Sequence, residues 1–124
     1  MPDDAPAASR NRVVRAAELT LTPDPLDPSQ VVSGSPEVSV AEVLDDGTVS
    51  VGVWRHTAGV STDVEADEVF VVLQGRATID VDGGPTLEVG PGDLGILAAG
   101  SRTTWTVHED LRKVYVLGSS GSDA

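Results

Sequence analysis

The sequence has no cysteine, and among its 124 residues there are only two histidines, two tryptophans, one tyrosine and one phenylalanine. The lack of cysteine excludes disulfides, thiolate zinc sites and cysteine nucleophiles together. No stretch approaches the roughly 20 apolar residues of a membrane span, and Met1–Arg10 lacks the apolar core of a signal peptide. We therefore expect a cytoplasmic protein that does not insert into a membrane.

Basic residues are also scarce. Eight Lys and Arg stand against 20 Asp and Glu, which gives a formal charge of −12. The longest basic cluster is the pair Arg112-Lys113, too little to offset the repulsion between this charge and a phosphate backbone or an anionic membrane. We expect no nucleic-acid partner, and the charge by itself indicates solubility.

The chain is long enough for one domain with its own core. Residues 1–11 and 118–124 are small, polar and without period, so we predict flexible tails around a domain spanning 12–117. Three prolines in Thr22–Gln30 exclude a helix interior or a central strand there. We expect this segment to be a loop over the domain surface.

The remaining sequence has the two-residue period of strands. Thr48–Arg55 and Arg76–Asp82 both alternate apolar and polar residues, and glycine turns such as "VDGGP" and "GPGD" separate the runs. No helical pattern of ten residues appears, so we predict an all-β antiparallel sandwich or barrel. Val69–Leu73 is apolar on both faces. A second sheet, the N-terminal segment or another subunit should cover its outer face, and a homodimer fits this requirement.

Several motifs occur in an order typical of one family. They are "GVW" at Gly52–Trp54, a glutamate seven residues before a glycine at Glu68 and Gly75, "GPGD" at Gly90–Asp93, a glycine five residues before a tryptophan at Gly100 and Trp105, and "RKVYV" at Arg112–Val116. Over roughly Glu37–Leu117 the chain resembles small RmlC-like cupins, in particular the (S)-ureidoglycine aminohydrolase cupin-domain family. The resemblance implies a cupin-type double-stranded β-helix, or jelly-roll barrel.

The resemblance also implies where a metal would bind. Metal-binding cupins use two histidines and a glutamate from the first motif and a third histidine from the second. The glutamate corresponds to Glu68, and the last histidine to Thr103. The other two fall on Thr62 and Val64 or, with one extra residue, on Ser61 and Asp63. Because all three imidazoles are absent, we expect no metal and no other cofactor.

The two histidines and the acidic run need separate interpretation. His108 is predicted to point away from Trp105 and to be exposed at a strand end. His56 shares a face with Trp54, and either lines a pocket or lies at the surface. Asp63, Glu65, Asp67 and Glu68 could hold a hard cation through oxygens, although such a run is more often a solvated loop. Glu68 differs, because its face continues into the barrel through Phe70.

A buried Glu68 needs a partner. Lys113 and Tyr115 share a face of the last strand, so we predict a Glu68–Lys113 ion pair with Tyr115 and Trp105 nearby, and the Trp105 ring closing the pocket mouth. The predicted ligand-binding residues are Trp54, His56, Glu68, Thr103, Trp105, Lys113 and Tyr115. We expect this pocket to bind a small polar metabolite without a metal. One alternative is an enzyme acting on a small nitrogenous or carbohydrate-like metabolite with Glu68 as catalytic acid or base. Another is a barrel without ligand that serves only in protein assembly.

Overall fold

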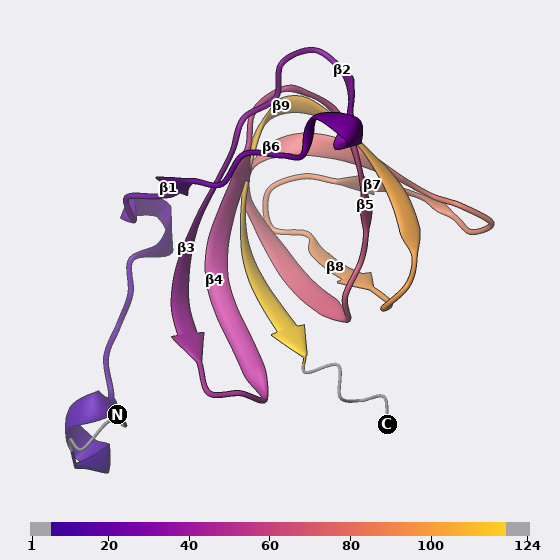
Figure 1. Cartoon of the computed structure of the whole chain (residues 1–124). Coiled ribbons are helices and arrows are strands. Elements are labelled where there is room, and N and C mark those ends of the chain that lie inside the picture. The colour runs from indigo at the N-terminus through magenta and orange to yellow at the C-terminus, as the bar shows by residue number, and fades with distance from the viewer. Residues whose placement is uncertain (1–5, 119–124) are drawn as a thin grey trace.

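A computed structural model describes residues 6–118, and Figure 1 shows that they form a barrel of strands with an N-terminal extension along its side. The strands are β1 (Thr22–Pro23), β2 (Val31–Ser33), β3 (Val38–Asp45), β4 (Val49–His56), β5 (Gly59–Val64), β6 (Glu68–Val81), β7 (Thr86–Val89), β8 (Leu94–Leu97) and β9 (Arg102–Gly118). Three short 3₁₀ turns are η1 (Ala7–Arg10), η2 (Ala16–Glu18) and η3 (Pro28–Gln30). The predicted all-β class is confirmed.

Two long strands, β6 and β9, run antiparallel and organise the barrel. The first half of β6 and the second half of β9 form one sheet with β8, β4, β3 and β1. The other halves form a second sheet with β7, β5 and β2. Every pairing is antiparallel, which is the jelly-roll arrangement expected of a cupin barrel.

The long strands bend where they pass from one sheet to the other. The register between β6 and β9 shifts between Val72 and Ala77. Gly75, in the middle of this interval, has a φ of 88°, and a Cβ there would collide with the backbone of Asp110. Only glycine adopts this conformation without strain and also lets the β9 backbone approach so closely. The bend turns both strands around a common interior.

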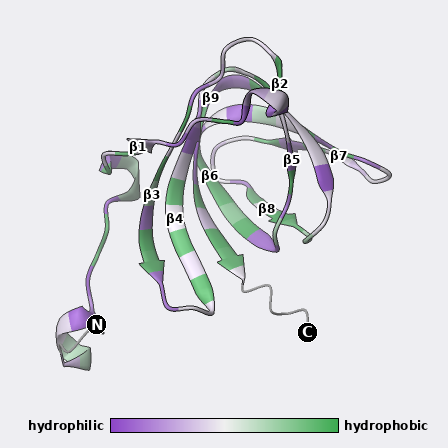
Figure 2. Ribbon diagram, in the orientation of Figure 1, coloured by the Kyte–Doolittle hydropathy of each residue, from purple (hydrophilic) through white to green (hydrophobic). Residues whose placement is uncertain are grey.

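The interior is filled by every second residue of the strands. Along β6, Phe70, Val72, Ala77 and Ile79 are almost fully buried. Along β4 the pattern is reversed, because Gly52 and Trp54 lie opposite the inward-facing Tyr115 and Lys113, and the valines between them, green in Figure 2, take the other face. The core cluster consists of Phe70, Val72, Ala77, Ile79, Val89, Leu97, Trp105, Val107, Leu111 and Tyr115. Alternation thus determines which residues face the barrel interior.

The outer face around β6 is different, because apolar side chains there are exposed. Val69 and Val71 pair with Ile96 and Leu94 of β8. Ile96 is 69% exposed and Val69 is 40% exposed. We call Val69, Val71, Leu94, Ile96 and Val116 the outer apolar patch. Neither a second sheet nor the N-terminal segment covers it in the described residues, so of the three alternatives that the sequence left open, another subunit remains.

The N-terminal segment packs elsewhere, next to the outward-pointing Arg112. The Arg112 guanidinium donates hydrogen bonds to the carbonyl oxygens of Ala16 and Leu19, at 3.0 and 2.7 Å from Nη2. The predicted domain start at residue 12 lies just before this contact. Of the predicted tails, residues 1–5 and 119–124 lie outside the described part, and η1 has no buried residue. No helix between residues 6 and 118 is long and apolar enough to cross a membrane.

Candidate ligand-binding site

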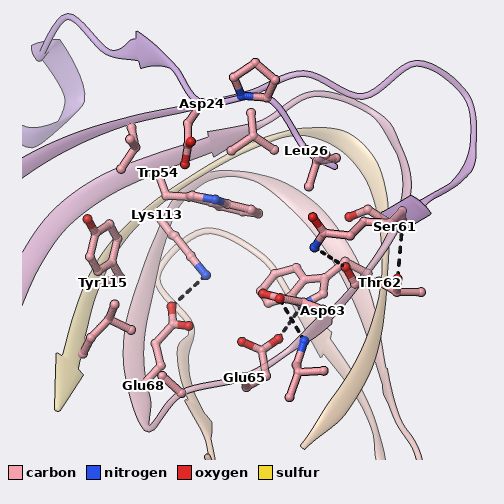
Figure 3. A pocket seen from close by; sticks show the side chains of 18 residues that line it. Asp24, Leu26, Trp54, Ser61, Thr62, Asp63, Glu65, Glu68, Lys113 and Tyr115 are labelled. Carbon is pink, nitrogen blue, oxygen red and sulfur yellow. Dashed lines mark hydrogen bonds and ion pairs between the residues drawn. The ribbon is translucent and has the colours of Figure 1, made fainter. Parts of the chain in front are cut away.

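A cavity of about 490 Å³ lies inside the barrel, between the two sheets and the loop that follows β1. Figure 3 shows polar and aromatic side chains converging on it from β4, β5, β6 and β9. The volume is that of a site for a small metabolite. The lining residues are Asp24, Pro25, Leu26, Gln30, Val38, Val40, Trp54, Ser61, Thr62, Asp63, Val64, Glu65, Ala66, Glu68, Trp105, Lys113, Tyr115 and Leu117.

The ion pair predicted from the sequence is present in this cavity. Lys113 Nζ lies 2.7 Å from Glu68 Oε2, and the two side chains are 5% and 6% exposed. Oε2 nevertheless has no hydrogen bond of ordinary geometry in the described residues, so this contact is an ion pair without a well-directed N–H bond. Burial raises the pKa of the Glu68 carboxyl, and the Lys113 charge opposes that rise.

Three aromatic rings surround the Lys113 ammonium. Nζ lies 4.3 Å from the centre of the Trp54 ring, 4.5 Å from that of Trp105 and 4.6 Å from that of Phe70. These distances are within the range of cation–π attraction, which strengthens when the cation is desolvated. The ammonium is therefore held by one carboxylate and three ring faces.

Glu65, which the sequence interpretation left in a solvated loop, is buried instead. Its Oε2 accepts hydrogen bonds from Thr103 Oγ1 at 2.6 Å and from Trp105 Nε1 at 3.0 Å. Glu65 follows Ser61 and Asp63 at a spacing of two, so extending the β5 alternation by two residues could have identified it. The solvated-loop prediction is wrong for Glu65, which is buried, while Asp63 and Asp67 are exposed; Glu68, predicted to face the interior, is buried.

His56 does not line the cavity and is not at the surface, so both of its predicted placements are wrong. It is fully buried beside Trp54, with ring centres 5.4 Å apart. Nδ1 lies 2.6 Å from the carbonyl oxygen of Thr57, which can only accept, so Nδ1 carries the proton. Nε2 then accepts from the Ser61 hydroxyl at 2.9 Å. Burial lowers the pKa of His56, which keeps the ring neutral behind the cavity wall.

Of the remaining predicted residues, some line the cavity and others do not. Trp105 and Tyr115 line the cavity, but Trp105 is only 4% exposed, and its ring lies in the interior rather than at the mouth. The Tyr115 ring packs over Gly52, where a Cβ would collide with its hydroxyl. Thr103 lines a neighbouring cavity and contributes to this one through Glu65. His108 is exposed as predicted, but it lies in the middle of β9 and not at a strand end. It bonds to Thr78, with 2.8 Å between Nε2 and Oγ1.

The register of β5 decides between the two alignments of the missing imidazoles. Ser61 pairs with Trp105 and Asp63 with Thr103, so Ser61 and Asp63 lie on the side of β5 that faces the interior. Ser61 is buried there, whereas Asp63 is exposed near the end of the strand, and Val64 is 57% exposed. Hydroxyls and carboxylates there do not make the nitrogen-rich set that a cupin metal uses. In residues 6–118 no three His, Cys, Asp or Glu side chains gather as metal ligands. A metal beside Glu68 would also meet the Lys113 charge, so the site does not fit one.

The mouth of the cavity is formed by the proline-rich loop, which no sequence signal assigned to the site. Asp24 and Leu26 reach over the opening in Figure 3. Asp27 caps η3 by accepting from the Ser29 amide, and Gln30 Nε2 donates to the Thr62 carbonyl oxygen at 3.0 Å. These bonds fix the loop against β5, as expected for a surface loop held by local capping.

Comparison with solved structures supports the fold. An EutQ protein from Clostridium difficile is 16% identical, with a TM-score of 0.69 and 86% of each chain covered. A predicted oxalate decarboxylase from Thermotoga maritima is 17% identical, with a TM-score of 0.65, over 86% of this chain and 98% of that one. At such identities the likeness shows the fold alone.

A protein of unknown function from Pseudomonas syringae pv. tomato is more similar in sequence. It is 28% identical with a TM-score of 0.72, and the match covers 81% of this chain but only 45% of that one. Comparison with curated proteins finds no match. The profile of the EutQ-like cupin domain matches residues 43–115, more than half of the chain. The chain therefore belongs to the EutQ-like cupin domain family.

Proposed function

We propose that this protein binds a small polar metabolite in the barrel cavity without using a metal ion. The observation that carries the proposal is the Lys113–Glu68 pair, which puts an ammonium 2.7 Å from the glutamate that a metal-binding cupin would use as a ligand. A fixed positive charge there repels a metal ion and orders the cavity wall. The partly buried Trp54 ring and the carboxylates of Asp24 and Asp63 also line the cavity, and an aromatic wall with a few polar groups is typical of metabolite sites.

Metal content tests the first half of the proposal. Protein purified without chelators and then incubated with manganese, iron, nickel or zinc should hold well under a tenth of an equivalent per chain by elemental analysis. The matched control restores the imidazoles with Ser61→His, Asp63→His and Thr103→His and removes the ammonium with Lys113→Met. That variant should gain metal. Near-stoichiometric metal in the unmodified protein would contradict the proposal.

Ligand screening tests the second half. A library of small polar metabolites should contain compounds that raise the melting temperature of the protein, because a ligand that binds only the folded state stabilises it. Glu68→Gln and Lys113→Met should abolish or change the response. Identical responses in the protein and both variants would mean that the compounds bind elsewhere.

The specific observation that favours an enzyme is the raised pKa of the Glu68 carboxyl, which burial moves toward the range useful for proton transfer. Resemblance to the ureidoglycine aminohydrolase group would make a small nitrogenous compound the substrate. A compound that stabilises the protein and is also converted, at a rate lost in Glu68→Gln, would favour this alternative. Stable binding without product favours the binding protein.

We further propose a homodimer through the outer apolar patch. Exposed apolar side chains lie side by side there on β8, β6 and β9, where no charged residue interrupts them. Contiguous apolar surface of this kind commonly marks an interface. Sedimentation equilibrium should give twice the mass of one chain at micromolar concentration, and a monomer at those concentrations would contradict the dimer.

A further inference from the structure

The charges that line the cavity do not balance. Four carboxylates face it, those of Asp24, Asp63, Glu65 and Glu68, whereas Lys113 is the one cationic side chain among the lining residues of the described chain. Lys113 is committed to Glu68 through their 2.7 Å contact. The cavity therefore has an excess of up to three negative charges. Asp24 and Asp63 are exposed at its open side, whereas Glu65 is buried, where Coulomb interactions are several times stronger than in water.

A buried carboxylate oxygen without a hydrogen bond gives an independent indication of a missing partner. Glu68 Oε2 is buried and has only the ion pair with Lys113. Glu65 is 7% exposed, and both of its hydrogen bonds within residues 6–118 go to Oε2, which leaves Oε1 accessible to a donor from a ligand. A buried acceptor without a donor costs free energy. Figure 3 shows that both carboxyl groups point toward the cavity.

Asp63 shows the effect of this excess. Its partial burial, and next the charge of Glu65, raise the pKa of the Asp63 carboxyl. The group would be more stable as an anion if a positive charge lay beside it. A ligand that brings hydrogen-bond donors and positive charge would satisfy Glu65 and relieve Asp63 together. An anionic ligand would meet repulsion from both.

We propose that the cavity binds a small organic cation that carries one or two ammonium groups. The ammonium groups lie against Asp63 and Glu65, Asp24 faces them from the loop, and the alkyl part of the ligand lies on the indole of Trp54. The positive charge of this ligand balances the carboxylates that Lys113 does not neutralise. This inference rests on the proposed binding function and adds the chemical class of the ligand.

Three probes of equal length separate charge from shape: 1,4-diaminobutane, 1,4-butanediol and succinate. Each is titrated into the protein at pH 7.5 and constant ionic strength. Intrinsic fluorescence is a suitable readout because the chain has two tryptophans and both line the cavity. We expect the diamine to bind at least ten-fold more tightly than the diol, and succinate not to bind.

Matched variants locate the binding. Asp63→Asn removes one negative charge from the cavity and should weaken diamine binding several-fold. Asp67→Asn removes the same charge from an exposed residue of the same segment, whose Oδ1 accepts from the Ala99 amide, and should leave binding unchanged. Equal losses in both variants would show a nonspecific charge effect and overturn the assignment.

The failure of this inference differs from the failure of the proposed function. If the diol or succinate binds as tightly as the diamine, the proposal of a cationic ligand is wrong, but the cavity still binds a polar molecule. If none of the three compounds changes the fluorescence or the melting temperature, the proposal of a cationic ligand is also overturned. Absence of any stabilising compound in the metabolite screen would overturn the binding function itself.

Discussion

The two faces of β9 near its end have opposite chemistry. Toward the interior, Lys113 is 4% exposed and Tyr115 is 9% exposed, so a charge and a phenol are buried. Toward solvent, Val114 and Val116 alternate with them, and Val116 is 38% exposed. In an ordinary sandwich strand the apolar residues would face inward and the polar ones outward.

This inversion is the reason for the two proposals made above, a ligand at the inner face and a second subunit at the outer face. Burying a charge costs free energy unless a partner compensates it, and exposing adjacent valines leaves hydrophobic stabilisation unused. The inner face has part of its compensation in Glu68 and the aromatic rings. The outer face has none in the described residues, which is the reason for proposing a second subunit.

Disrupting the inner face should have the largest effect. Glu68→Gln leaves the Lys113 ammonium buried without a counter-charge and should lower the free energy of unfolding by about 3–5 kcal/mol. Urea denaturation measures this. The double variant Glu68→Gln/Lys113→Met removes both charges and should recover stability to within about 1 kcal/mol of the parent protein, because an apolar side chain fits among the rings.

A control pair lies on the surface. Arg76 and Glu109 are in contact at 3.1 Å with side chains 55% and 62% exposed, so Glu109→Gln should change stability by less than about 1 kcal/mol. If Glu68→Gln were as stable as the parent protein, or if Lys113→Met changed neither stability nor ligand binding, the ion pair would have no role in the cavity.

Charging the outer face should have a smaller effect, on association alone. Ile96→Glu places a carboxylate in the centre of the outer apolar patch and should weaken dimerisation at least ten-fold, or about 1.4 kcal/mol. Sedimentation at several concentrations measures the change. Val32→Glu makes the same substitution at a residue that is 59% exposed on β2, and it should leave the dimer intact. Dissociation by both variants would point to net charge and not to the patch.

The smallest effect concerns pH, behind the inner face. In the folded chain His56 has a lowered pKa and stays neutral, whereas in the unfolded chain it binds a proton near pH 6.5. The unfolded state therefore gains protons as the pH falls below 6.5, and this residue makes stability decrease by at most about 1.4 kcal/mol per pH unit.

His56→Gln should remove that contribution. The free energy of unfolding of the variant, measured between pH 7.5 and 5.5, should fall less steeply than that of the parent protein. The raised pKa values of Asp63 and Glu68 act in the opposite direction, because these carboxyls bind protons more readily in the folded chain, and they are common to both proteins. Equal slopes would mean that His56 is protonated in the folded state.

Alternation made much of this arrangement predictable from the sequence. The inward direction of Lys113, Tyr115 and Glu68 follows from a period of two, and the ion pair follows from the cost of burying charge. The glycine turns and prolines likewise defined the ends of the strands and the loop before β2. These inferences depend on local backbone geometry, which neighbouring residues determine.

The errors concern long-range packing. His56 is buried between Val38 of β3 and Leu111 of β9, and Glu65 is buried because Thr103 and Trp105, about 40 residues away, supply donors. Asp24 reaches the cavity because β1 pairs with β3. Composition indicates that such residues are polar and does not say which distant donors they will meet.

The pairing of β9 also has a consequence for how the chain acquires its structure. This strand is hydrogen-bonded to β4, β5 and β6 and is part of both sheets. The β9 residues that pair with β4 lie about 60 residues further along the chain. During synthesis the barrel therefore cannot close until residues 102–118 have left the ribosome. Proteins dominated by such distant pairings fold in milliseconds to seconds. During that time the valines of β4 and β6 are exposed, which makes the unfinished chain prone to aggregation.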